Sequence, residues 1–134
     1  MRTFKSVPVD RTNLIYYRKR ADECIKLAEH AQANRLWFGA CINAVHGGIA
    51  LADCLSVFFR GTRYAGTSHD EAIQFYSSLQ IDKPEFRQSI QNLAKLISIK
   101  NASEYAGEQI NEKDAEAILK SLLRFRDFVV KILP

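Results

Sequence analysis

Apolar residues recur along most of this chain at steps of three and four positions, the spacing of one face of an α-helix. This pattern predicts five helices, over approximately residues 13–32, 35–59, 69–80, 83–99 and 112–132. No stretch shows the alternation typical of a strand, and residues 1–12 are predicted to be irregular. Because short connections favour antiparallel neighbours, we expect one all-α domain over residues 1–134, folded as an up-and-down helical bundle.

The second predicted helix, residues 35–59, is unusually rich in small side chains near its centre. Two of these residues, Gly47 and Gly48, lie in the helix interior, where each glycine costs about 1 kcal/mol relative to alanine. That cost is tolerable if the missing side chains let another helix come close. We therefore expect this helix to be the central element, contacted on more than one side.

Capping signals predict several helix ends. Gly61 is expected to end the second helix, and Ser68, with a glutamate three positions later, is expected to cap the third. The run Asp82-Lys83-Pro84-Glu85 combines a capping aspartate with an early proline and predicts the start of the fourth helix. Asn111 is expected to cap the last helix.

Composition is that of an ordinary soluble globular protein, with 47% hydrophobic and 25% charged residues. No segment approaches the ~20 continuous apolar residues of a membrane span, so no membrane contact is expected. The first ten residues lack the apolar core of a signal peptide, which predicts a cytoplasmic location. The formal net charge of +4 permits an anionic partner without requiring one.

Metal and disulfide chemistry is not expected. The three cysteines, Cys24, Cys41 and Cys54, are odd in number, widely spaced and on apolar helix faces. No His-x-x-His or Glu-x-x-His spacing is present, so a zinc site would need ligands from scattered positions. We therefore predict neither a metal nor another cofactor.

Candidate chemistry lies in residues 60–69, which connect the second and third helices. Arg63 and His69 are separated there by five residues. Arginine is a fixed cation whose planar donor fork suits phosphate oxygens, and histidine transfers protons near neutral pH. One interpretation is an RNA phosphodiesterase, in which His69 moves a proton at the ribose 2′-hydroxyl or leaving oxygen and Arg63 binds the scissile phosphate. The alternative is two solvated loop residues, with Arg63 paired to Asp70 or Glu71.

These residues resemble the motifs of HEPN (higher eukaryotes and prokaryotes nucleotide-binding) domains. HEPN domains are small α-helical bundles whose hallmark is an arginine followed after four to six residues by a histidine. The runs Asn43-Ala44-Val45-His46 and His69-Asp70-Glu71-Ala72 are similar to further family motifs, and Lys100 with Tyr105 is similar to a lysine and aromatic pair of the next long helix. Many members are metal-independent ribonucleases that work as homodimers, often as toxins or host-defence effectors.

The resemblance implies a metal-independent endoribonuclease that cleaves RNA by 2′-hydroxyl attack at a homodimer cleft. Arg63 and His69 would be its catalytic residues, and each protomer would supply one motif histidine. The products would be a 2′,3′-cyclic phosphate and a 5′-hydroxyl end. The candidate partners are a second copy of the chain, RNA or a nucleotide, and an antitoxin protein. The candidate substrate-binding residues are Arg60, Asn43, His46, Lys100 and Tyr105.

Other interpretations stay open at this point. Tyr64 follows Arg63, where active family members commonly carry a small polar residue. A non-catalytic HEPN-like module that binds a nucleotide or a protein is therefore a second candidate, and a purely structural helical adaptor is a third. His46 likewise has two interpretations. It either joins Asn43 and Asp53 in a polar lining beside the Arg63–His69 cleft, or it is a core histidine bonded to a carboxylate or the backbone.

Overall fold

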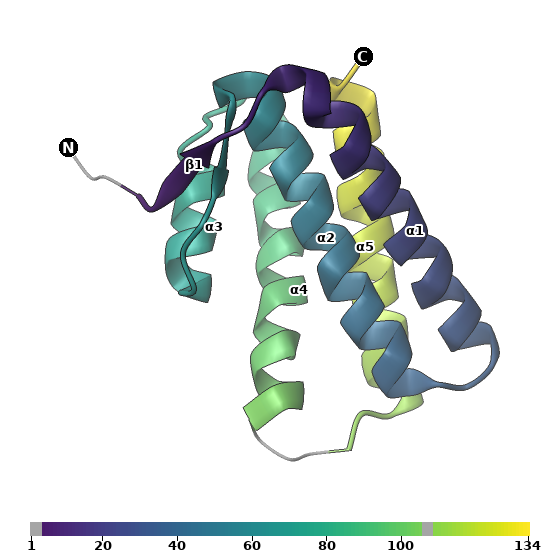
Figure 1. Ribbon diagram of the computed structural model, residues 1–134. Coiled ribbons are helices and arrows are strands. Elements are labelled where there is room, and N and C mark those ends of the chain that lie inside the picture. The colour runs from purple at the N-terminus through teal and green to yellow at the C-terminus, as the bar shows by residue number, and fades with distance from the viewer. Residues whose placement is uncertain (1–3, 106–108) are drawn as a thin grey trace.

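The structure is a computed structural model that describes residues 4–105 and 109–134, with the side chains of all of these except residues 99–105. In these ranges the chain forms five α-helices, and the all-α helical bundle is confirmed (Figure 1). A short 3-10 helix, Arg11–Asn13, precedes them. The helices are α1 Leu14–Ala33, α2 Trp37–Arg60, α3 His69–Ser77, α4 Phe86–Tyr105 and α5 Glu112–Ile132.

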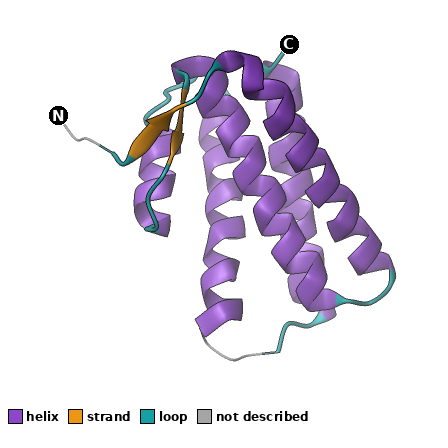
Figure 2. Cartoon of the chain, viewed as in Figure 1, coloured by secondary structure: helices purple, strands orange, loops and turns teal. Residues whose placement is uncertain are grey.

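The four long helices form the body of the bundle, and each runs opposite to the long helix before it (Figure 2). The shorter α3 lies beside α4 at the edge of the bundle. Between α2 and α3 the chain first runs back along the bundle as an extended segment, so α3 points the same way as α2. This extended return is what places the residue 60–69 segment against the side of α2.

Helix α2 is the central element, as predicted, and it packs against α1, α4 and α5. Its two interior glycines lie where neighbouring helices approach. A Cβ added to Gly47 would lie 3.4 Å from Cβ of Cys24 on α1 and 3.5 Å from Leu122 on α5. A Cβ added to Gly48 would lie only 2.7 Å from Cδ1 of Leu96 on α4. The small residues therefore set how closely α4 approaches the central helix.

Helix α2 is also long and apolar enough, by length and composition, to cross a membrane, with a mean hydropathy of 1.5. The sequence-based expectation concerned an unbroken apolar run, which His46 and Asp53 interrupt in this helix. Burial inside the molecule accounts for the composition, since 67% of the apolar window is buried against the other helices. A central helix surrounded by neighbours needs apolar side chains on nearly every face.

A two-stranded antiparallel sheet corrects the prediction of an irregular N-terminus without strands. Strand β1 (Ser6–Pro8) pairs with β2 (Thr62–Tyr64), and Val7 lies opposite Arg63. Three-residue strands are too short to show alternation in a sequence. The two strands are also separated along the chain by α1 and α2, so no local hairpin signal marks their pairing.

Most predicted caps are confirmed. Gly61 ends α2 with a φ of 65°, a left-handed conformation that favours glycine. Asn111 forms a reciprocal capping box with Asp114 at the start of α5. The predicted start of the fourth helix at the Asp82–Glu85 run was wrong, because turns continue to Phe86 before α4 begins. Helix α4 also continues to residue 105, through part of the segment predicted to be a connection.

Candidate functional site: the Arg63–His69 cavity

A cavity of about 400 Å³ lies where β2, α3, α2 and α4 meet, and both Arg63 and His69 line it. The structure thus brings together the two residues on which the sequence interpretation depends. Polar side chains reach the cavity from β2 and α3 and, as Asp53, from α2, while Ile49 on α2 and Ile97 on α4 are apolar. Its lining residues are Ile49, Asp53, Arg63, Tyr64, Gly66, Thr67, Ser68, His69, Ala72, Tyr76 and Ile97.

Arg63 is held in place by the backbone of its strand. Hydrogen bonds to β1 fix one edge of β2, and just beyond the paired residues the amide of Ala65 donates to the carbonyl of Lys5 at 2.9 Å. On the other side, the buried hydroxyl of Ser56 on α2 donates to the carbonyl of Thr62 at 2.6 Å. The strand next to Arg63 is therefore tied both to the N-terminal segment and to the central helix.

The guanidinium of Arg63 is half-buried and has no carboxylate partner at ion-pair distance. Across residues 4–98 and 109–134, whose side chains are described, the ion pairs within 4.0 Å are Arg126–Asp127 and Lys131–Glu85. The interpretation in which Arg63 pairs with Asp70 or Glu71 is therefore wrong. Within the described part of the chain, its Nη1 donates one hydrogen bond, to the carbonyl of Tyr64 at 3.4 Å. The positive charge thus faces the cavity without a neutralising contact.

His69 is the first residue of α3, and the loop before it is fixed by side chains. The hydroxyl of Ser68 accepts a hydrogen bond from the amide of Glu71 at 3.2 Å, which confirms the predicted cap. Tyr64 folds back over Gly66, and its hydroxyl donates to the carbonyl of Ser68 at 3.1 Å. A Cβ on Gly66 would collide with the Tyr64 ring, so glycine is required for this close approach. Tyr64 therefore fixes the path of the chain between Arg63 and His69.

Asp53 is the one acidic residue among the described side chains that line the cavity, and it is only 8% exposed. It accepts a 2.8 Å hydrogen bond at Oδ1 from the hydroxyl of Tyr76, which is also buried. Burial raises the pKa of Asp53 to about 6, although the Tyr76 hydrogen bond and the charges of Arg63 and Arg20 act in the opposite direction. Burial and the neighbouring carboxylate raise the pKa of Tyr76 well above its ordinary value, so this phenol stays a hydrogen-bond donor.

Only part of this arrangement could be predicted from the sequence. One interpretation placed Asp53 in a polar lining together with Asn43 and His46, but no role was given to Tyr76. The signal for Asp53 is visible in the sequence, since it is a single acid within the apolar run of the central helix. The Tyr76 contact has no such signal, because it joins two helices at a distance of 23 positions along the chain.

Arg60, Asn43 and His46, three of the predicted substrate-binding residues, are not among the described residues that line the cavity. The guanidinium of Arg60 donates to the carbonyl of Ser78 at 2.8 Å, and the amide of Asn43 donates to the carbonyl of Gly39 at 2.9 Å. His46 is exposed, which contradicts its interpretation as a core histidine. Its exposure follows from its place on α2, two turns before the part of the helix that Tyr76 covers. The side chains of Lys100 and Tyr105 lie outside the described residues.

The cysteines are free thiols with no evident part in the site. Cys41 and Cys54 are buried, and burial raises their pKa values to about 11 and about 12. Both thiols therefore stay protonated and pack as small apolar groups. Among the described side chains, no three histidine, cysteine, aspartate or glutamate residues come together in a way that could hold a metal ion.

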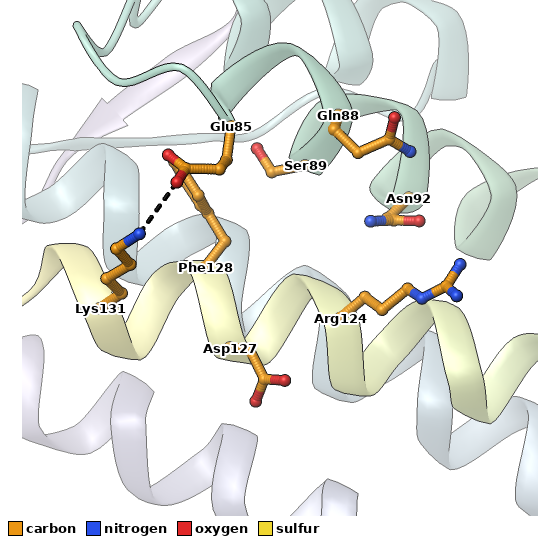
Figure 3. Close-up of a pocket in the computed structure, with 8 residues that line it drawn as sticks. All are labelled: Glu85, Gln88, Ser89, Asn92, Arg124, Asp127, Phe128 and Lys131. Atoms are coloured by element: carbon orange, nitrogen blue, oxygen red, sulfur yellow. Dashed lines mark hydrogen bonds and ion pairs between the residues drawn. The ribbon is translucent and has the colours of Figure 1, made fainter.

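A second cavity, of about 350 Å³, lies between α4 and α5 (Figure 3). At one end Lys131 pairs with Glu85 at 2.9 Å, and at the other end Asn92 and Arg124 approach from the two helices. Asn92 is buried and its Oδ1 has no hydrogen-bond partner. No imidazole lines this cavity, and its lysine is already neutralised by a carboxylate. Its side chains therefore offer less for proton transfer than those around Arg63.

Comparisons with known proteins add nothing to these observations. No protein-family model, no curated protein and no solved structure matches this chain. What the site does therefore follows from its own side chains.

Proposed function

We propose that this protein is a HEPN-like, metal-independent endoribonuclease that cleaves RNA in the Arg63–His69 cavity. The observation that carries the proposal is that an imidazole and a guanidinium with no carboxylate partner among the described side chains line one cavity. The cavity's volume of about 400 Å³ lies within the ~300–1,000 Å³ typical of small-ligand pockets. It is large enough to receive a phosphate together with part of a nucleotide.

Arg63 has the properties needed to stabilise a phosphoryl transition state. Its planar donor fork can contact two non-bridging oxygens at once, and its charge is not already used by a carboxylate. Attack of the ribose 2′-oxygen on phosphorus increases negative charge on those oxygens. A guanidinium in a half-buried site offsets this charge more strongly than one in bulk water.

His69 supplies proton transfer at the same phosphate. Imidazole can accept or donate a proton near neutral pH, and the cleavage needs one proton removed from the 2′-hydroxyl and one delivered to the leaving 5′-oxygen. The position of His69 at the start of α3, fixed by the Ser68 cap, gives its ring a defined approach. The products predicted are a 2′,3′-cyclic phosphate and a 5′-hydroxyl.

The proposal is tested by incubating the purified protein with single-stranded RNA in the presence of a metal chelator. We expect cleavage by the wild type and losses of about 10²–10⁴-fold in His69→Ala and about 10²–10³-fold in Arg63→Ala. His30→Ala and Arg87→Ala are matched controls, because both residues are exposed and neither lines the cavity. Cleavage that is equal in all five proteins would show a contaminating nuclease and contradict the proposal.

A non-catalytic binding module is the second candidate, and Tyr64 is the observation that favours it. The position after the motif arginine carries a large side chain whose hydroxyl is engaged with Ser68, where active HEPN proteins commonly carry a small polar group. This candidate predicts no cleavage by the wild type. It also predicts nucleotide or RNA binding that survives His69→Ala and is lost in Arg63→Ala.

A homodimer remains a prediction of the resemblance. The mass of the protein in solution, measured by light scattering, tests this prediction directly. In a composite site the second motif histidine would come from the partner subunit, and a monomeric but active protein would exclude that arrangement.

A further inference from the structure

We infer that Asp53 is the second proton-transfer group of this cavity and acts as the base at the ribose 2′-hydroxyl, while His69 acts as the acid at the leaving oxygen. This inference rests on the proposed ribonuclease function. It also changes the architecture of the site, because one protomer then carries both groups that the cleavage needs.

The geometry that supports this role begins with the position of Asp53. Its side chain comes from the central helix and lines the same cavity as Arg63 and His69. It is more than nine-tenths buried and has no ion-pair partner within 4.0 Å among the described side chains. Such burial is unusual for a carboxylate that is not paired. Among the described side chains, its Oδ1 accepts one hydrogen bond, the 2.8 Å contact from the Tyr76 hydroxyl. No described side chain donates to its other oxygen, and the carboxylate lines the cavity.

Several charged and titratable groups surround Asp53. Tyr76 from α3, Arg63 from β2 and Arg20 from α1 each act to lower its pKa. His69 from α3 lines the same cavity, and Cys54 is its neighbour on α2. The residue of α4 that lines the cavity, among those described, is the apolar Ile97. Burial outweighs the neighbouring positive charges and raises the pKa of Asp53 to about 6. The carboxylate is therefore largely ionised at pH 7, yet it is a much better base than an exposed aspartate.

The proposed step balances in protons and electrons. The Asp53 carboxylate takes the proton of the 2′-hydroxyl as the 2′-oxygen forms its bond to phosphorus. The bond between phosphorus and the 5′-oxygen breaks, and that oxygen takes its electron pair together with a proton from the His69 imidazolium. The products are a 2′,3′-cyclic phosphate and a 5′-hydroxyl, with Asp53 protonated and His69 neutral. Exchange of protons with water restores both groups.

The pH dependence of RNA cleavage tests this assignment. We expect kcat/KM of the wild type to rise with pH up to about 6, as Asp53 ionises. Asp53→Asn keeps an oxygen that can accept the Tyr76 hydrogen bond, so the wall of the cavity is retained. In this variant we expect kcat/KM to fall by about 10²–10⁴-fold and the rising limb to disappear.

Tyr76→Phe gives a readout that a purely structural aspartate would not produce. The Tyr76 hydrogen bond lowers the pKa of Asp53, so its removal raises that pKa. The rising limb of the profile should therefore move to higher pH in Tyr76→Phe while maximal activity is largely kept. An unmoved limb in this variant, or an unchanged profile in Asp53→Asn, overturns the inference.

A mixing experiment tests whether one protomer suffices. Asp53→Asn and His69→Ala are each expected to be nearly inactive, and a single-protomer site predicts that their mixture stays inactive. Activity that recovers on mixing would show that Asp53 and His69 act from different subunits and would overturn the one-protomer site.

Failure of the proposed function and failure of this inference can be told apart. A wild type that does not cleave RNA removes the proposed function and this inference together, whereas cleavage that needs His69 but not Asp53 removes the inference alone.

Discussion

The hydroxyl of Tyr76 donates a 2.8 Å hydrogen bond to Oδ1 of Asp53, and this buried contact joins α3 to the central helix α2. It satisfies one oxygen of a carboxylate that would otherwise be a costly group to bury. It also anchors α3, whose first residue is His69, against the helix that forms the cavity floor. One hydrogen bond thus contributes both to the packing of the fold and to the chemistry of the site.

Asp53 should make the protein less stable as the pH rises from about 4 to about 6. Its pKa is raised from 3.8 to about 6 in the folded state, so the unfolded chain releases this proton first. The folded state is therefore favoured at low pH, and about 3 kcal/mol of that advantage is lost once the pH exceeds 6. Urea unfolding measured from pH 4 to pH 7 should show this loss in the wild type relative to Asp53→Asn. Parallel stability curves for the two proteins would contradict the account of the buried carboxylate.

The two adjacent glycines of α2 should respond differently to alanine. In Gly48→Ala the new Cβ would lie 2.7 Å from Cδ1 of the fully buried Leu96, so we expect a net loss of about 1–3 kcal/mol in the free energy of unfolding. In Gly47→Ala the nearest atoms lie at 3.4–3.5 Å, which is ordinary contact. The gain of up to about 1 kcal/mol in helix propensity should then make this matched variant neutral or slightly stabilised. Equal effects in the two variants would contradict the close α2–α4 packing.

Tyr64→Phe should loosen the connection between Arg63 and His69. The substitution removes the hydrogen bond from the hydroxyl to the carbonyl of Ser68 but keeps the ring over Gly66. We expect a loss of about 1 kcal/mol in the free energy of unfolding. Tyr16→Phe is the control, because the Tyr16 side chain is 60% exposed and is expected to contribute almost nothing. If both variants match the wild type in chemical denaturation, the Tyr64 hydroxyl does not hold the loop.

The helical scaffold could be predicted from the sequence because its signals are local. Periodic apolar positions predicted the five helices, and Gly61, Ser68 and Asn111 end or begin helices as their residue types indicate. The meeting of Arg63 and His69 in one cavity also had a local cause, since five residues in a short connection keep the two side chains near each other. Features that depend on neighbouring residues in the sequence were therefore accessible.

Features that depend on contacts between distant parts of the chain were not accessible. The pairing of Val7 with Arg63 joins segments on either side of two long helices, and nothing near either residue indicates it. The burial of Asp53 likewise depends on where α3 docks. The placement of His46 also depends on distant contacts, and it was interpreted either as part of a polar lining with Asp53 or as a core histidine. Tyr76 of α3 contacts α2 at Asp53, whereas His46, two turns earlier on α2, is exposed.

The chemistry of the ends that the protein leaves on RNA tests the central claim most directly. An RNA oligonucleotide would be incubated with the wild-type protein and a metal chelator. A parallel reaction would use the same oligonucleotide with a single 2′-deoxy sugar at the cleaved position. The products of both reactions would be analysed by mass spectrometry. An Arg63–His69 site that uses 2′-hydroxyl attack predicts 2′,3′-cyclic phosphate and 5′-hydroxyl ends from the all-ribose strand and no cleavage at the deoxy position. Intact RNA, cleavage at the deoxy position, or ends bearing a 5′-phosphate would contradict it.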